Sequence, residues 1–223
     1  MMTRPPSPDA KGSHHSAACA PLARGPKGVD PLSTTHHGDP LSFLLNEREQ
    51  TRLATWNVLT LGQEGKAGLL IRELEKYKVE VAAISEVRWR SEGEDSLAGG
   101  RWKFMHSAAD DKGVGGVGIM ITGRAKAAWE AAGATWTAHG RRIVEARMKN
   151  QTGFTTMVAV YAPTEEHHDE AEEFYDELQK VVAKVPRRDV LLLLGDFNAR
   201  LGVDNNGYER VMGRCALDEK RNK

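Results

Sequence analysis

Hydrophobic residues follow two different spacings from Thr51 onward, and each spacing predicts one kind of element. Apolar residues recur every three or four positions over residues 67–77 and 171–185, which is typical of amphipathic helices. Short apolar or β-branched runs predict strands at residues 53–58, 79–85, 117–122, 143–149, 155–161 and 190–194. The first of these runs is expected to form a buried strand, and the last a fully buried one.

The order of these elements predicts an α/β fold with antiparallel strand pairs. Several strands follow one another between Trp102 and Tyr161, which argues against a simple βαβ repeat. Thr164 is expected to cap the second helix, with two glutamates in its first turn, and Pro186 to help end it. The Gly-rich stretch 113–118 has the spacing of a dinucleotide-binding loop but leads into a strand, so we interpret it as a loop that precedes a strand.

Pattern and composition divide the chain near residue 50. The first 45 residues hold seven of the nine prolines, together with serine, glycine and two histidine pairs, and show no hydrophobic period. Residues 1–48 are expected to stay flexible, because they offer too little apolar surface to offset the entropy of ordering. Residues 49–223 are expected to form one domain, in which the segment 203–223 lacks a period and is expected to be poorly packed.

Composition places the chain among ordinary globular proteins. Hydrophobic residues make up 40% and charged residues 28% of the chain, which excludes a wholly disordered, a collagen-like or a disulfide-scaffold protein. The 31 basic and 31 acidic residues balance, so no overall positive charge indicates a nucleic-acid partner. An enzyme that meets phosphate through a metal ion is compatible with this balance.

Cysteines, apolar runs and the N-terminus predict an intracellular protein, nuclear or cytoplasmic. The two cysteines, Cys19 and Cys215, lie in stretches without pattern, so no structural disulfide is expected. The longest clean apolar run, residues 190–194, is far shorter than the ~20 residues that span a bilayer. No apolar signal-peptide core follows the N-terminus. A membrane partner is therefore not expected, and the sequence carries no signal for an oligomeric state.

Polar side chains follow three of the predicted strands at the point where each strand ends. Asn57 ends the first strand, Glu86 follows the second, and Asp196 with Asn198 follows the last through Gly195. Strand ends carry the loops that build sites, so these side chains are expected to gather at a sheet edge. Carboxylate and amide oxygens suit Mg²⁺, which polarises phosphate oxygens and eases the ionisation of water. Asp196 would then take a proton from water, and Asn198 would hold that carboxylate or a phosphate oxygen.

Each of these residues also has a simpler interpretation. Glu86 alone is compatible with a surface ion pair to Arg88. Asn57 and Asp196 are compatible with ordinary turns, in which Asn, Asp and Gly are common. The order of these residues and the strands that separate them favour the metal–phosphate site.

Five motifs in the same order resemble those of the endonuclease/exonuclease/phosphatase superfamily. They are Thr55-Trp56-Asn57-Val58, Ile84-Ser85-Glu86-Val87-Arg88-Trp89, Gly116-Val117-Gly118-Ile119, Val160-Tyr161-Ala162-Pro163 and Gly195-Asp196-Phe197-Asn198-Ala199. The chain is most similar to the craniofacial development protein 2-like group and to the endonuclease domains of LINE-type retrotransposons, over about residues 51–223. The motifs are more specific for the superfamily than for a substrate.

This resemblance implies a four-layer α/β/β/α sandwich like that of DNase I. It implies phosphodiester hydrolysis that depends on Mg²⁺, with Mn²⁺ as an alternative ion. DNA is the expected partner, with RNA or a phosphorylated small molecule as alternatives. Arg88 and Trp89 would border the substrate groove, although a place in the core is the competing interpretation for Trp89.

The resemblance also assigns roles to residues of the site. Glu86 would ligate the metal with Asn57 close by. Tyr161 would contact the scissile phosphate. Asp196 would orient or deprotonate the attacking water, with support from Asn198.

After Asn198 the sequence departs from the superfamily's pattern. The superfamily ends with a further strand that bears an Asp and then an Asp-His pair, whose histidine contacts the phosphate in the transition state. Here no histidine follows His168, and neither Asp204 nor Asp218 follows a buried strand. The resemblance therefore implies a domain that is incomplete at its C-terminus and weakly active or inactive, since losing such a group commonly costs several kcal/mol of barrier.

Three functions follow as hypotheses. The first is Mg²⁺-dependent, endonuclease-like hydrolysis of nucleic acid, impaired in this chain. The second is hydrolysis of a small phosphate ester or a phospholipid head group on the same fold. The third is a non-catalytic interaction module that keeps the sheets but has lost the C-terminal chemistry.

Overall fold

The computed structural model describes residues 50–131, 133–150, 153–164, 168–199 and 206–211. The flexible segment expected over residues 1–48 lies outside these ranges, and so do both cysteines and most of residues 203–223. The described piece of that last segment, residues 206–211, is exposed and contains turns. No helix within the described ranges is long and apolar enough to cross a membrane.

The strands of the described chain form two mixed sheets. The first sheet has the order β1-β2-β5-β4-β3 and the second the order β6-β7-β8-β9. The first contains β1 (Leu53–Asn57), β2 (Val81–Ser85), β3 (Gly93–Leu97), β4 (Trp102–His106) and β5 (Val117–Ile121). The second contains β6 (Thr135–His139), β7 (Ile143–Asn150), β8 (Gly153–Tyr161) and β9 (Val190–Asp196). β1 and β2 pair in parallel, as do β8 and β9, while the other pairs are antiparallel.

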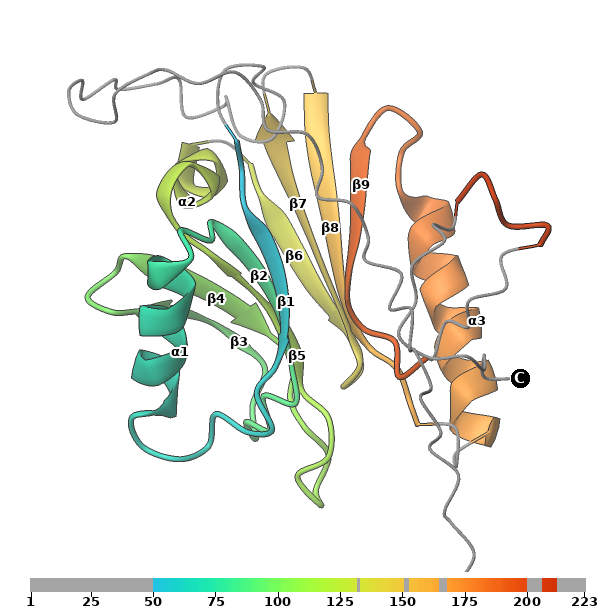
Figure 1. Cartoon of the computed structure of the whole chain (residues 1–223), viewed down its shortest axis with the longest axis horizontal. Coiled ribbons are helices and arrows are strands. Elements are labelled where there is room, and N and C mark those ends of the chain that lie inside the picture. The colour runs from blue at the N-terminus through green and yellow to red at the C-terminus, as the bar shows by residue number, and fades with distance from the viewer. Residues whose placement is uncertain (1–49, 132, 151–152, 165–167, 200–205, 212–223) are drawn as a thin grey trace, which may run out of the picture.

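Two of the described helices, α1 (Lys66–Lys76) and α3 (His168–Lys184), cover the outer faces of the two sheets. A third helix, α2 (Gly123–Ala131), packs against the core between the sheets. Figure 1 shows α1 beside the first sheet and α3 beside the second, on opposite sides of the molecule. Leu74 of α1 packs in one buried cluster with Phe104 of β4, and Phe174 of α3 packs in another with Val158 of β8. This layer order confirms the predicted α/β/β/α sandwich.

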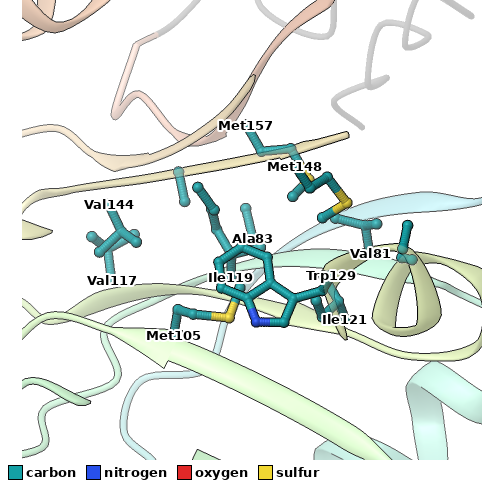
Figure 2. Packing of buried hydrophobic residues seen from close by; sticks show 14 residues of the cluster. Val81, Ala83, Met105, Val117, Ile119, Ile121, Trp129, Val144, Met148 and Met157 are labelled. Atoms are coloured by element: carbon teal, nitrogen blue, oxygen red, sulfur yellow. The ribbon is translucent and has the colours of Figure 1, made fainter. Parts of the chain in front are cut away.

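The main hydrophobic core lies between the sheets. Ile119 and Ile121 of β5 lie on one side and Val144 and Met148 of β7 on the other, all of them buried (Figure 2). The ring of Trp129, from α2, reaches into the same cluster. Because side chains alternate across a strand, β5 serves the cores on both of its faces and is buried throughout.

Two strands that were predicted to be buried are half open to solvent. Leu191 and Leu193 of β9 expose 37% and 39% of their surface, and Leu53 and Trp56 of β1 expose 37% each. Among the described strands, β1 and β9 each lie at one end of their sheet. The prediction of buried strands was therefore wrong, because an apolar run indicates a strand but not its position within the sheet.

The second helix of the sequence prediction ends as expected, and the residues just before it lie outside the described chain. α3 is described from His168, and it stops at Lys184, two residues before Pro186. Thr164, the expected cap, is exposed. The two glutamates expected in the first turn lie outside the described residues.

Asp189 ties the start of β9 to the neighbouring strands of the second sheet. Its carboxylate accepts hydrogen bonds from Arg147 Nε at 2.6 Å, from Arg147 Nη2 at 3.1 Å and from Thr156 Oγ1 at 2.8 Å. The Asp189 side chain is only 3% exposed. The hydrogen bond from Arg147 holds the pKa of Asp189 below its ordinary value, against the opposing effect of burial.

We expect Asp189→Asn to lower the free energy of unfolding by about 3 kcal/mol at neutral pH, because Arg147 then loses its charged partner. The wild-type carboxylate stabilises the fold above its unfolded-state pKa of about 3.9, and this contribution is lost as pH falls through the lower folded-state pKa. Urea unfolding followed by tryptophan fluorescence should show a smaller loss of stability on acidification for the variant than for the wild type. The same acid dependence in both proteins would contradict this role.

Candidate active site

The two parallel strand pairs bring polar residues from both sheets together. In the first sheet Asn57 is paired with Ser85 at the ends of β1 and β2, and Glu86 follows directly. In the second sheet Tyr161 is paired with Asp196 at the ends of β8 and β9. Parallel strands run in the same direction, so each pair delivers two polar side chains to one edge. Because β1 packs beside β9 and β2 beside β8, the two edges meet.

Glu86 accepts hydrogen bonds from three side chains of this site. Its Oε1 accepts hydrogen bonds from Asn57 Nδ2 at 2.9 Å and from the Tyr161 hydroxyl at 3.0 Å. Its Oε2 accepts a hydrogen bond from Arg88 Nη2 at 2.6 Å. Glu86 is only 8% exposed. The ion pair with Arg88 is thus present, but it is one contact of a largely buried carboxylate rather than a surface pair.

Asp196 joins the same group through Asn57. Asn57 Nδ2 lies 3.0 Å from Asp196 Oδ2 and 2.9 Å from Glu86 Oε1, so one amide nitrogen bridges the two carboxylates. Asp196 Oδ1 accepts the backbone N–H of Asn198 at 3.0 Å, and Asn198 Nδ2 donates to the carbonyl of Ala162 at 2.6 Å. The structure therefore brings together all five residues that were expected to hold the metal or to act in catalysis.

Hydrogen bonds keep Glu86 ionised despite its burial. Burial raises the pKa of Glu86, but the bonds from Asn57, Arg88 and Tyr161 outweigh this effect, and the pKa lies below its ordinary value. Burial raises the pKa of Tyr161, and the bond to Glu86 and its charge raise it further. At neutral pH the site therefore holds a charged acceptor beside a protonated phenol.

Left-handed backbone conformations concentrate at this site. Glu86, Arg88 and Asn198 have φ angles of 57°, 58° and 45°, a region that residues other than glycine rarely adopt. Gly116 permits part of this geometry, because a Cβ there would lie 2.8 Å from the backbone nitrogen of Arg88. The Gly-rich stretch 113–118 thus forms a loop that lies against Arg88 and leads into β5, as predicted. Such strain persists where the surrounding structure holds functional groups in place.

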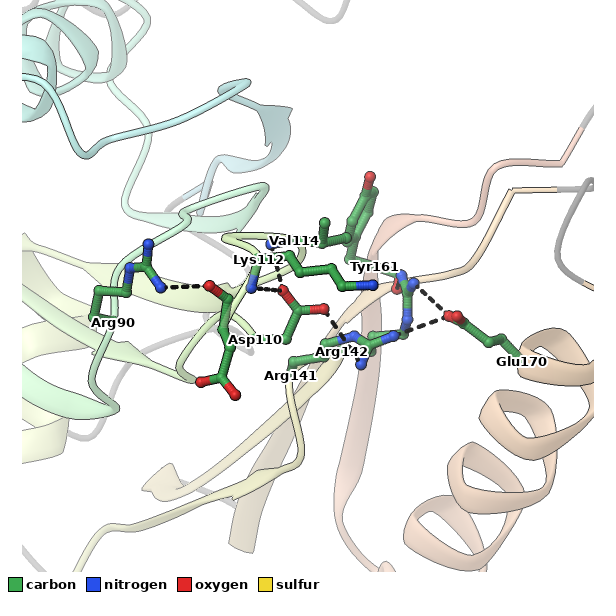
Figure 3. A network of polar contacts seen from close by, with 9 residues as sticks. Arg90, Asp110, Lys112, Val114, Arg141, Arg142, Tyr161 and Glu170 are labelled. Carbon is green, nitrogen blue, oxygen red and sulfur yellow. Dashed lines mark hydrogen bonds and ion pairs between the residues drawn. The ribbon is translucent and has the colours of Figure 1, made fainter.

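A network of charged side chains borders Tyr161 (Figure 3). Arg142 Nη1 donates to the carbonyl of Tyr161 at 3.2 Å, and its guanidinium lies 5.4 Å from the ring centroid. Arg141 and Arg142 both donate to Glu170 of α3, at 2.9 Å and 3.0 Å, and Arg141 lies 3.6 Å from Asp110. In the sequence, the adjacent basic pair Arg141-Arg142 is compatible with phosphate contacts and with rim charges, and a single basic pair does not decide between them.

Of the two residues expected to border a substrate groove, the structure places Arg88 in contact with the site. The Trp89 ring packs edge-on against Phe104 and His106, with centroid distances of 5.4 Å and 4.7 Å. This packing favours the competing interpretation, in which Trp89 belongs to the core.

The donor set suits a hard divalent cation that is held by few protein ligands. Within the described part of the chain, no group of three or more His, Cys, Asp or Glu side chains is placed so that it could hold a metal ion by itself. Mg²⁺ is commonly held by one or two carboxylates with water and substrate phosphate, and Glu86 and Asp196 supply such a pair.

The Asn57 side chain lies between the turn after β1 and the two carboxylates. Its Oδ1 accepts the backbone N–H of Leu59 at 3.0 Å, while its nitrogen donates to Glu86 and Asp196. Asn57 thus lies beside Glu86, as expected.

Known proteins share this sequence pattern over most of the chain. The model of the Endonuclease/Exonuclease/phosphatase family matches residues 54–209. Craniofacial development protein 2 of Bos taurus is 27% identical over 171 residues, which cover 76% of this chain and 27% of that protein. The same protein of Tragulus javanicus is 26% identical over 171 residues, which cover 76% of this chain and 28% of that protein. The chain thus spans about a quarter of the length of these relatives.

The fold of this chain resembles those of several solved structures. The 3′-5′ exonuclease NExo from Neisseria meningitidis is 18% identical with a TM-score of 0.50, over 66% of this chain and 58% of that one. The endonuclease domain of TRAS1, a telomere-specific non-LTR retrotransposon, is 17% identical with a TM-score of 0.48, over 67% of this chain and 61% of that one. At such identities the likeness concerns the fold alone. Because the family model covers most of its length, the chain belongs to the endonuclease/exonuclease/phosphatase family.

Proposed function

We propose that this chain hydrolyses phosphodiester bonds of nucleic acid, with DNA as the preferred substrate, using a Mg²⁺ or Mn²⁺ ion held by Glu86 and Asp196. The observation that carries this proposal is the Asn57 amide, which bridges two carboxylates from opposite sheets. Two carboxylates held this close repel each other, and a cation between them offsets that repulsion. Nucleases of the family generally depend on a divalent metal.

The residues of the site divide the work of hydrolysis. The bound cation would polarise a phosphate oxygen and ease the loss of a proton from water. Asp196, fixed by Asn57 and by the backbone of Asn198, orients the attacking water and accepts its proton. Tyr161 remains protonated, and its single hydroxyl hydrogen turns from Glu86 to a phosphate oxygen as charge develops there.

Positive side chains beside Tyr161 support a polyanionic substrate. The whole chain is neutral, but Arg88, Arg141 and Arg142 lie around this one site, where their partners are the carboxylates of Glu86, Glu170 and Asp110. Arginine matches phosphate geometry well, because its planar guanidinium can donate two parallel hydrogen bonds. A local cluster of this kind favours a nucleic-acid backbone.

Nicking of supercoiled plasmid DNA, with the protein in excess, tests this function. We expect nicking with Mg²⁺ or Mn²⁺ and none with EDTA. Release of inorganic phosphate from inositol phosphates without nicking would favour the phosphatase hypothesis. A folded chain that binds Mn²⁺ but cleaves neither substrate would favour the interaction module.

Glu86→Gln is expected to weaken Mn²⁺ binding about tenfold or more, because it removes a charged ligand while keeping the shape of the side chain. Titration of Mn²⁺ followed by electron paramagnetic resonance measures this affinity without any need for turnover. Glu73→Gln is the matched control, since Glu73 forms an exposed ion pair with Lys76 on α1. Equal affinities for the wild type and Glu86→Gln would contradict a cation site at Glu86.

A further inference from the structure

We propose that Arg88 is an exchangeable partner of Glu86. Its guanidinium balances the carboxylate while no cation is bound, and it turns to the substrate phosphate once Glu86 is engaged by a cation. This inference rests on the proposed function, and it assigns to Arg88 a role that couples the two binding events.

The two oxygens of Glu86 differ in how firmly they are held. Oε1 accepts hydrogen bonds from Asn57, which also holds Asp196, and from Tyr161. Both donors come from the ends of strands. Oε2 accepts the short 2.6 Å bond from Arg88, whose side chain is 45% exposed while that of Glu86 is 11% exposed. Arg88 is therefore the donor that can leave without disturbing a strand.

The backbone of Arg88 is fixed, so only its side chain is free to exchange partners. Its N–H donates to the carbonyl of Gly115 at 3.2 Å, and Gly116 packs against the same nitrogen. The neighbouring Val87 is fully buried and donates to the carbonyl of Gly116 at 2.9 Å. With the chain held on both sides, the exchange is a change of side-chain rotamer at a solvent-facing position, which needs no movement of a loop.

Charge and shape select phosphate as the second partner of Arg88. The guanidinium is always protonated, and its planar set of donors fits a carboxylate or a phosphate equally well. Once a cation neutralises Glu86, the Arg88 guanidinium has lost its charged partner and is able to bind another anion. A phosphodiester that contacts the Tyr161 hydroxyl would also lie close to the Arg88 guanidinium, because Tyr161 and Arg88 contact the same carboxylate.

This exchange has opposite consequences for the two ligands. Arg88 competes with a cation for Glu86, so its removal strengthens cation binding. The same residue contacts phosphate, so its removal weakens DNA binding. By thermodynamic linkage the cation then strengthens DNA binding in the wild type through the release of Arg88.

The variant Arg88→Met should bind Mn²⁺ about fivefold or more tightly than the wild type, because it removes both the ion pair and a nearby positive charge. Arg90→Met is the matched control: it removes the same charge two residues away, but Arg90 donates to the carbonyl of Asp111 at 2.7 Å. Its Mn²⁺ affinity should stay within about twofold of the wild type. Arg88→Lys, which keeps the charge without the planar donors, should fall between the two.

Fluorescence anisotropy with a short labelled DNA duplex supplies the second readout. Addition of Mn²⁺ should tighten duplex binding by the wild type more than by Arg88→Met. If the wild type binds Mn²⁺ but Arg88→Met binds it no more tightly than Arg90→Met does, Arg88 does not compete for Glu86. The inference about Arg88 is then wrong, while the proposed function stands. If neither the wild type nor Arg88→Met binds Mn²⁺, the proposed function fails and the inference with it.

Discussion

Asp196→Asn should lower the rate of Mg²⁺-dependent plasmid nicking by about 10²–10³-fold, which is what the loss of a general base commonly costs. Asparagine has nearly the shape of aspartate, and its Oδ1 can still accept the N–H of Asn198 that Asp196 accepts at 3.0 Å. The fold is therefore kept, while the proton acceptor, one of the two negative charges beside Asn57 and the acceptor of the 3.0 Å hydrogen bond from Asn57 are lost. Time courses of nicking on agarose gels measure the rate.

The control for this variant is Asp176→Asn, which makes the same change at an exposed position on α3. We expect its nicking rate to equal that of the wild type. Nicking by Asp196→Asn at the wild-type rate would show that Asp196 neither holds a cation nor takes a proton, and the roles given to this site would be wrong.

Gly195→Ala should destabilise the protein by more than about 3 kcal/mol, because the new methyl group meets backbone rather than a movable side chain. A Cβ at Gly195 would lie 2.0 Å from the carbonyl oxygen of Val160, its partner in β8. The φ angle of Gly195 is 146°, which alanine rarely adopts. Relief of the clash would separate β9 from β8 next to Asp196.

Urea unfolding compares this variant with Gly68→Ala. Gly68 lies in α1, and a Cβ there would have no neighbour within 4 Å. Gly68→Ala should therefore raise stability by about 0.5–1 kcal/mol, since alanine favours a helix more than glycine does. If Gly195→Ala unfolded at the wild-type urea concentration, the close approach of β9 to β8 would be disproved.

Much of the fold follows from the spacing of apolar residues. Apolar residues recur every three to four positions in α1 and α3, and most of the strands contain apolar or β-branched runs. The local pattern and the final structure therefore agree. The site followed from a second regularity. Asn57, Glu86 and Asp196 each come at the end of such a run, and parallel pairing in each sheet brings these ends together.

Elements without that local signal were not predicted. β3 reads Gly-Glu-Asp-Ser-Leu and is a strand because it pairs with β4. α2 is nearly as apolar on one side as on the other, and its Trp129 is fixed by the core between the sheets. The exposed faces of β1 and β9 depend on their position in the sheets. In each case, contacts with an element that is distant in the sequence determine the local structure. A short stretch of sequence carries no information about these contacts.

The contacts of single atoms in the site could also not be predicted from the sequence. The motifs predict that Asn57 and Glu86 are near each other, but not that the nitrogen of Asn57 faces the carboxylates while its oxygen bonds Leu59. Likewise, the sequence leaves the ion pair of Arg88 with Glu86 and the metal–phosphate site as alternatives. The structure shows that the ion pair belongs to the same cluster of side chains.

Anomalous diffraction from crystals grown with Mn²⁺ tests the central claim most directly. The account predicts one strong anomalous peak in contact with the carboxylates of Glu86 and Asp196, with the Arg88 guanidinium moved away from Glu86. A well-ordered Glu86 still bonded to Arg88, with no peak beside it at saturating Mn²⁺, would contradict the account.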